Sequence, residues 1–225
     1  MTRFLNRRDA GRQLAAALGA HRGVDALVLA LPRGGVPVAA EIAAALDAEL
    51  DILLVRKLGF PFEPEFAMGA IADAPEPIIV RNEAEIRASG VTEAAFEAVC
   101  TRERAELARR RALYVGDRKH ARVAGRMVIL VDDGVATGAT VKAAIIALKR
   151  MQPARLILAV PVGAPDIIAA LRHEVDQLVC LATPHPFDAS GYFYDDFAQV
   201  PDAEVIDALA RSVGPGGAKG APAPR

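Results

Sequence analysis

The chain has 225 residues, of which 52% are hydrophobic, and a formal net charge of −1. This length suits one α/β domain with a sizeable core, and the charge gives no general attraction to nucleic acid or to an anionic membrane. No apolar run reaches the ~18 residues of a membrane span, and residues 1–9 lack the apolar core of a signal sequence. Cys100 and Cys180 form no C-x-x-C pair, so we expect reduced thiols and a cytoplasmic protein.

The first part of the chain predicts a helix, a buried strand at 24–31 and a second helix over 38–46. Between the strand and the second helix lie Arg33, Gly34 and Gly35. Glycines leave backbone N–H groups accessible, and an arginine offers a planar charged fork to phosphate oxygens. Taken alone, this turn is either an anion-binding loop or a glycine-rich turn with a surface arginine.

A second buried strand is expected at 50–55, ending in Arg56 and Lys57. Ligands of a parallel sheet bind at the carboxyl ends of its strands, so we expect Lys57 to share one rim with Arg33. The alternative for Lys57 is a solvated strand end.

The next stretch, residues 58–81, combines a loop with two short expected strands. Residues 58–66 are rich in Gly, Pro and Phe, and they predict either a lid or a contact within a homo-oligomer. Residues 67–72 and 77–80 predict two short paired strands around a turn. A long helix capped by Thr92 is expected to follow.

The most informative stretch is residues 128–140, VILVDDGVATGAT. Its apolar start predicts a strand buried on both faces, which two adjacent carboxylates, Asp132 and Asp133, bring to an end. A small-residue loop and a helix follow, and the unpaired N–H groups at a helix start favour an anion. The carboxylates suit sugar hydroxyls, a Mg²⁺ ion or a developing positive charge next to a phosphate. The residues of the predicted phosphate cradle are Ala136, Thr137, Gly138, Ala139 and Thr140.

Competing motifs account for this stretch less well. An ordinary strand-to-helix turn with a threonine cap explains one of the threonines but not two carboxylates at the end of a buried strand. The G-x-x-x-x-G-K-[ST] phosphate loop is missing, and no G-x-G-x-x-G follows a strand, which disfavours a dinucleotide oxidoreductase. The four histidines lack metal-ligand spacing.

Strands are expected at 155–160 and 177–181, and a closing helix at 201–213. The segment 183–200 between them holds most of the remaining aromatic side chains. It predicts either a hood over a planar ring or a satellite cluster that packs this segment onto the sheet. We expect residues 1–213 to form the single domain and residues 214–225, rich in Gly, Pro and Ala, to be disordered.

The stretch at 128–140 resembles the loop that binds 5-phosphoribosyl 1-pyrophosphate (PRPP) in type I phosphoribosyltransferases. The sequences LPRGGVPV at 31–38 and VDDGVATGAT at 131–140 are most similar to poorly characterised bacterial members. The order of strands and helices predicts a mostly parallel sheet of about five strands flanked by helices. The resemblance implies a small hood at residues 183–200 and a flexible lid, for which residues 58–81 are our candidate.

The resemblance implies a transferase that moves a phosphoribosyl group from PRPP to a nitrogen acceptor, such as a nucleobase, and releases pyrophosphate. It implies that Asp132 and Asp133 are catalytic and that residues 136–140 bind the 5′-phosphate. It places Arg33 and Gly34, with Gly35 and Lys57, on the pyrophosphate, and Mg²⁺ on PRPP and water with no protein ligand assigned. A protein that senses PRPP without turnover is the alternative. No signature identifies the acceptor base.

Overall fold

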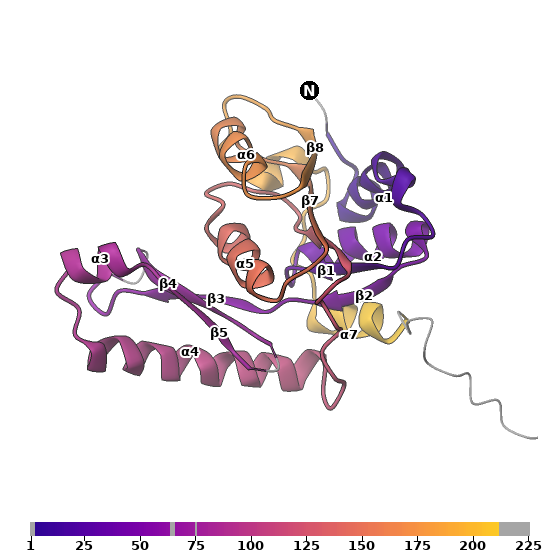
Figure 1. Cartoon of the computed structure of the whole chain (residues 1–225). Coiled ribbons are helices and arrows are strands. Elements are labelled where there is room, and N and C mark those ends of the chain that lie inside the picture. Colours follow the sequence, from indigo (N-terminus) through magenta and orange to yellow (C-terminus); the bar gives the residue numbers. More distant parts are fainter. Residues whose placement is uncertain (1–2, 64–65, 75, 212–225) are drawn as a thin grey trace, which may run out of the picture.

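The computed structural model describes residues 3–63, 66–74 and 76–211. Figure 1 shows a core in which helices flank a central sheet, and a long arm that projects from it. The predicted tail at 214–225 lies outside the described residues. None of the described helices is both long and apolar enough to cross a bilayer.

The core sheet has five parallel strands in the order β2-β1-β6-β7-β8. Its central strand, β6, pairs with β1 on one side and β7 on the other, and every β6 residue is buried. This confirms the predicted mostly parallel α/β fold. The bounds are β1 Ala26–Ala30, β2 Glu49–Ile52, β6 Met127–Val131, β7 Arg155–Val162 and β8 Gln177–Ala182.

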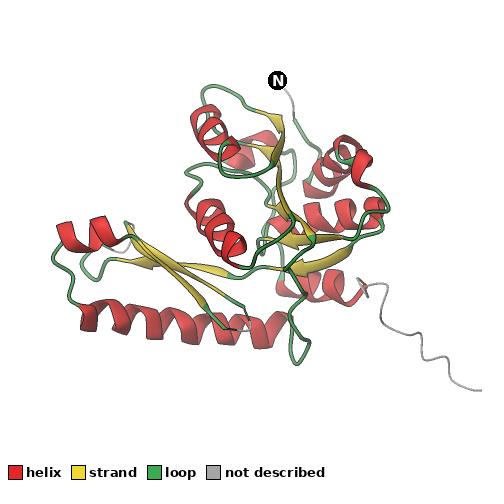
Figure 2. Ribbon diagram, viewed as in Figure 1, coloured by secondary structure: helices red, strands yellow, loops and turns green. Residues whose placement is uncertain are grey.

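Helices cover both faces of this sheet, as Figure 2 shows. Side chains of successive strand residues point to opposite faces. Ile129 therefore packs in the same cluster as residues of α1 and α2, whereas Leu130 packs with residues of α5 and α6. Both faces are apolar because both are covered. The helices are α1 Arg7–Ala17, α2 Gly35–Leu46, α5 Ala139–Arg150, α6 Pro165–Arg172 and α7 Asp202–Arg211, with short 3₁₀ turns η1 Gly19–His21 and η2 Ser190–Phe193.

The arm, residues 55–114, is inserted between β2 and β6. Its three strands, β3 Val55–Gly59, β4 Ala67–Ala72 and β5 Ile78–Arg81, form an antiparallel sheet. The short helix α3 Glu83–Ala88 and the long helix α4 Glu93–Tyr114 complete it. The expected strand pair in this region is confirmed, and so is the α4 cap, in which Thr92 Oγ1 accepts from the Ala95 N–H at 3.2 Å.

The predicted end of the second core strand is wrong. We expected a strand at 50–55 that ends in Arg56 and Lys57, but β2 ends at Ile52 and both basic residues lie inside β3. The chain stays apolar and buried through residues 53 and 54, where it leaves one sheet for the other. Periodicity alone does not reveal such a change of partner strand.

The contact between α1 and α2 requires a residue without a side chain at Gly11. A Cβ atom there would lie 2.6 Å from the carbonyl oxygen of Val38 and 2.9 Å from Glu41 Cβ. We therefore expect Gly11→Ala to lower the free energy of unfolding by about 1–3 kcal/mol, although alanine favours helices. Gly19→Ala is the matched control, because a Cβ at Gly19 has no neighbour within 4 Å. Urea unfolding of both variants measures the difference. Equal stability of the two variants would show that α1 and α2 can move apart to accommodate a methyl group at position 11 without a cost in free energy.

Candidate active site

The two carboxylates lie directly beyond the carboxyl end of β6, where the sequence placed them. They are only partly exposed, and the Asp133 N–H donates to Asp132 Oδ1 at 2.9 Å. Burial and the neighbouring charge of Asp133 raise the pKa of Asp132 well above its usual value. Burial also raises the pKa of Asp133, although Arg7 opposes that shift. The free protein therefore holds two carboxyl groups in a place that disfavours two negative charges.

The loop after the acidic pair presents its backbone to solvent. The Val135 N–H donates to the carbonyl oxygen of Val162 at 2.9 Å, which ties the loop to the end of β7. From Ala136 to Thr140 the chain is exposed apart from the half-buried Gly138. Within the described part of the chain, the N–H groups of residues 136–140 have no protein acceptor. This arrangement can bind an anion at the start of α5.

Gly138 is the N-cap residue of α5 and has a φ of 71°, a left-handed conformation that glycine adopts without a steric penalty. No side chain caps this helix, so the alternative of a threonine N-cap is wrong. A Cβ at Gly138 would lie 2.7 Å from Ile167 Cγ2 of α6. Both the backbone and its surroundings thus require glycine here.

The loop between β1 and α2 lies against the acidic pair. Gly34 packs so closely on the carboxylate of Asp133 that a Cβ would overlap with it. Gly35 is buried, and its N–H donates to the Leu31 carbonyl oxygen at 3.0 Å, so the expectation of an accessible N–H at Gly35 is wrong. A Cβ atom added at position 35 would lie 2.7 Å from the Val131 carbonyl oxygen, so the absence of a side chain at Gly35 allows the loop to approach β6.

Arg33 and Lys57 differ in their relation to this site. Arg33 stands next to Gly34, and its guanidinium pairs with Asp202 of α7 at 3.5 Å. Lys57 is exposed within β3, opposite Ala70 on the arm sheet. The structure therefore brings Arg33 next to the acidic pair through Gly34, but it carries Lys57 onto the arm.

Two residues of this site were not found from the sequence. Arg7, in the first turn of α1, donates from Nε to Asp133 Oδ2 at 2.7 Å. Tyr194 donates from its hydroxyl to the Asp133 backbone carbonyl at 2.6 Å, and burial raises the pKa of this phenol. Both residues are far from Asp133 in sequence, so local spacing could not reveal them.

The aromatic segment 183–200 packs beside the acidic loop. Tyr194 is 2% exposed and belongs to a small cluster with Phe4 and Val162, so the satellite cluster expected as one alternative is present. Ser190 lies against Gly134, where a Cβ would clash with it. Tyr192 remains 71% exposed, which leaves one ring of this segment available to stack on a planar molecule.

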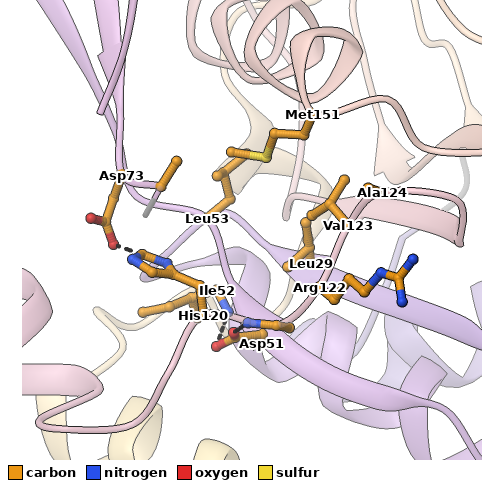
Figure 3. A pocket seen from close by; sticks show the side chains of 12 residues that line it. Leu29, Asp51, Ile52, Leu53, Asp73, His120, Arg122, Val123, Ala124 and Met151 are labelled. Atoms are coloured by element: carbon orange, nitrogen blue, oxygen red, sulfur yellow. Dashed lines mark hydrogen bonds and ion pairs between the residues drawn. The ribbon is translucent and has the colours of Figure 1, made fainter. Parts of the chain in front are cut away.

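A separate cavity of about 370 Å³ lies where the arm joins the core. Figure 3 shows apolar walls, with His120 directed toward Asp73 at one side. Arg111 of α4 also pairs with Asp73, at 3.0 Å, and burial lowers the pKa of His120. None of the predicted site residues lines this cavity. Its lining side chains labelled in Figure 3 include Leu29, Ile52, Leu53, Val123 and Met151.

Comparison with known proteins agrees with this geometry. A sequence profile described as "Phosphoribosyl transferase domain" matches residues 5–192. The chain belongs to the phosphoribosyltransferase family, a family of pentosyltransferase enzymes. The protein TT1426 of Thermus thermophilus has a similar structure, with a TM-score of 0.81 and 39% identity over 94% of this chain and 100% of that one.

Two Mycobacterium tuberculosis proteins, from strains CDC 1551 and H37Rv, are provisionally named phosphoribosyl transferases. Each is 45% identical to this chain over 212 residues. The match covers 94% of this chain and 47% of each relative, so the chain spans about half the length of these relatives.

The raised pKa of Asp132 predicts an effect on stability. A carboxyl group whose pKa is higher in the folded chain destabilises the fold above its unfolded pKa, and this effect vanishes once both states are protonated. We expect Asp132→Asn to raise the free energy of unfolding at about pH 7, on the order of 1–2 kcal/mol. The gain should shrink as the pH falls toward about 3.

Urea unfolding at both pH values measures this difference. Asp207→Asn, which removes an exposed carboxylate on α7, is the control and should change stability little. An unchanged or lower stability of Asp132→Asn at about pH 7 would contradict the unfavourable burial of Asp132 and its repulsion by Asp133.

Proposed function

We propose that this protein binds PRPP with Mg²⁺ and transfers its phosphoribosyl group to a nitrogen acceptor, a nucleobase, with release of pyrophosphate. The observation that carries the proposal is the juxtaposition of two partly buried carboxylates with a helix start whose N–H groups have no protein acceptor among the described residues. A sugar phosphate matches both halves, because its phosphate needs donors and its hydroxyls need acceptors.

In this proposal the 5′-phosphate lies in the cradle at residues 136–140, with Thr137 and Thr140 adding hydroxyl donors. The ribose hydroxyls donate to Asp132 and Asp133. The pyrophosphate lies over the β1–α2 loop, where Arg33 and Gly34 contact it and Gly35 shapes the turn. Lys57 would assist from β3 of the arm sheet.

The chemical step is a displacement at C1 of the ribose. The lone pair of the acceptor nitrogen forms the new bond while the bond from C1 to the pyrophosphate oxygen breaks, and the pyrophosphate leaves with that electron pair. Positive charge develops on the sugar, and the carboxylates of Asp132 and Asp133 stabilise it. Their positions are fixed before the reaction, so they need not reorganise during it.

Mg²⁺ would neutralise charge on the leaving pyrophosphate. In this proposal the ion takes most of its ligands from PRPP and water, because Mg²⁺ retains waters and uses few protein ligands. We assign no side chain of this chain to it.

The surrounding segments fit the same proposal. Residues 183–200 serve as the hood over the acceptor base, with the exposed ring of Tyr192 available for stacking. Residues 58–81 serve as the lid, and the exposed Phe66 and Phe62 in this stretch are suited to a contact within a homo-oligomer. We place the protein in the cytoplasm, without nucleic acid or membrane partners.

The phosphate cradle can be tested through Gly138. We expect Gly138→Val to lose measurable binding of ribose 5-phosphate and PRPP, because the side chain is strained at positive φ and collides with Ile167. Gly125→Val is the matched control, since Gly125 also has positive φ, at 73°, but its Cβ would meet open space. Titration calorimetry with and without Mg²⁺ measures both ligands. Wild-type affinity in Gly138→Val would place the phosphate elsewhere, and a wild-type protein that binds no PRPP would contradict the proposal.

A measurement of turnover distinguishes an enzyme from a protein that only senses PRPP. We expect Asp133→Asn to lower turnover by roughly 10²–10³-fold but PRPP affinity much less, because the amide still bonds hydroxyls and lacks the charge. Arg33→Ala should weaken PRPP more than ribose 5-phosphate, because only PRPP carries the pyrophosphate. Pyrophosphate release with purines, pyrimidines and small amines measures turnover. Tight PRPP binding without release by any acceptor would favour the sensor.

A further inference from the structure

The carboxylate of Asp133 is bound by a group that the proposed reaction does not use. The Nε atom of Arg7 donates to Asp133 Oδ2 at 2.7 Å, and the side chains of the two residues are only 11% and 16% exposed. An ion pair at such low exposure is screened little by solvent, unlike the surface pairs elsewhere on α1. Arg8, the next residue, pairs with Glu41 and Glu204 and is 45% exposed.

The guanidinium of Arg7 is itself fixed from several sides. It lies 3.7 Å above the centroid of the Phe197 ring, and its Nη1 donates to the carbonyl oxygen of Ala198 at 2.8 Å. Phe4, just before α1, pairs in parallel with Tyr194, just after η2. The Phe4 N–H donates to the carbonyl oxygen of Phe193, and the Asp195 N–H donates to the carbonyl oxygen of Phe4. A guanidinium held by stacking and by two hydrogen bonds has little rotational freedom.

This arrangement controls one oxygen of the carboxylate. Arg7 engages Oδ2, the oxygen that lies against Gly34, and leaves Oδ1 out of that bond. The hydroxyl of Tyr194 holds the backbone of the same residue through the carbonyl oxygen. Both the main chain and the side chain of Asp133 are therefore fixed by residues of distant segments.

The charged and titratable groups that face Asp133 are Asp132 from its own loop, Arg7 from α1 and Tyr194 from the segment after η2. The loop at Gly34 contributes Arg33, whose guanidinium pairs with Asp202 of α7 at 3.5 Å. Burial disfavours an ionised Asp133, and Arg7 favours it. A neutral carboxyl group would neither stabilise positive charge on a sugar nor accept as strongly from its hydroxyls.

We propose that Arg7 is a positioning residue, which keeps Asp133 charged and turned so that its other oxygen meets the ribose. This inference rests on the proposed function, because the ribose of PRPP is the group that Asp133 would meet. Arg7 acts through Asp133 and contacts neither the substrate nor the reacting atoms.

A double-mutant cycle tests this role, with PRPP and Mg²⁺ as the ligand in titration calorimetry. We expect Arg7→Met to weaken PRPP binding roughly 10-fold at about pH 7, because a charged hydrogen bond is lost. In an Asp133→Ala background, Arg7→Met should change the affinity by less than about twofold. A purely structural role, such as holding the aromatic segment in place, would weaken binding equally in both backgrounds and would overturn the proposal.

The pH dependence gives a second readout. Arg7→Met should lose PRPP affinity most at low pH and recover part of it as the pH rises, because Asp133 then ionises without its partner. Arg7→Lys should restore this pH profile, since it returns the charge. Arg8→Met is the matched control, and we expect it to leave affinity and pH profile unchanged. A pH profile of Arg7→Met that parallels the wild type would contradict the role assigned to its charge.

Failure of the proposed function is distinguishable from failure of this inference. Carboxyl ¹³C NMR of the ligand-free protein follows the titration of Asp133, assigned by its absence in Asp133→Asn. The Asp133 signal should titrate at higher pH in Arg7→Met than in the wild type. If the wild type binds no PRPP, the proposed function is contradicted. The difference in the Asp133 titration between Arg7→Met and the wild type still decides whether Arg7 keeps Asp133 charged. An unshifted titration would overturn the inference whatever the ligand.

Discussion

Two adjacent carboxylates end a strand that is buried along its whole length, and this placement constrains everything around them. A pair of like charges in a poorly solvated place is unfavourable unless nearby groups compensate for it. The fold supplies part of that compensation through Arg7, from a helix more than a hundred residues away in sequence. In the proposed complex the sugar hydroxyls, which donate to both carboxylates, supply more. The site is therefore arranged for a ligand and is less favourable without one, as binding sites often are.

Close backbone approach is the second constraint. Gly34 lies against the Asp133 carboxylate, Gly134 lies under Ser190, and Gly138 turns the chain into α5 beside Ile167. At each of these positions a Cβ atom would collide with a neighbour, so three loops can meet only because these residues lack side chains. The glycines thus have a packing role in addition to exposing N–H groups. At Gly35 the packing role is the one observed, because its N–H already has an acceptor within the loop.

Much of this arrangement could be predicted from the sequence because it is local. A buried strand, an acidic pair and a helix start are contiguous, and the parallel order of the sheet brings Arg33 to the same rim. The features that could not be predicted depend on contacts between residues distant in sequence, or on the point where the chain changes its partner strand. Residues 53 and 54 are apolar and buried like Ile52 at the end of β2, so nothing in the pattern marks where the chain leaves the core sheet for β3. The predicted strand end at Arg56 and Lys57 is wrong for this reason.

Arg7 escaped prediction for a different reason. Its partner, its aromatic platform and the carbonyl it donates to come from segments separated from it by 126 to 191 residues. A single arginine in the first turn of a helix carries no local signal of such contacts, and an exposed neighbour such as Arg8 has the same sequence character. Only the geometry separates the two arginines, because one is enclosed with a carboxylate and the other is solvated.

The two halves of the site are consequently held in different ways. The proposed phosphate cradle is built from backbone at a helix start, so its geometry is set by the secondary structure and is insensitive to most side-chain changes. The acidic half depends on side chains that reach it from α1 and from the segment after η2, and those in turn depend on the pairing of Phe4 with the chain near Tyr194. Loosening that pairing would leave the cradle intact but would free Asp133 to rotate and to take up a proton. Under the proposed function, affinity for the phosphate and control of the sugar could therefore vary independently, because different elements determine them.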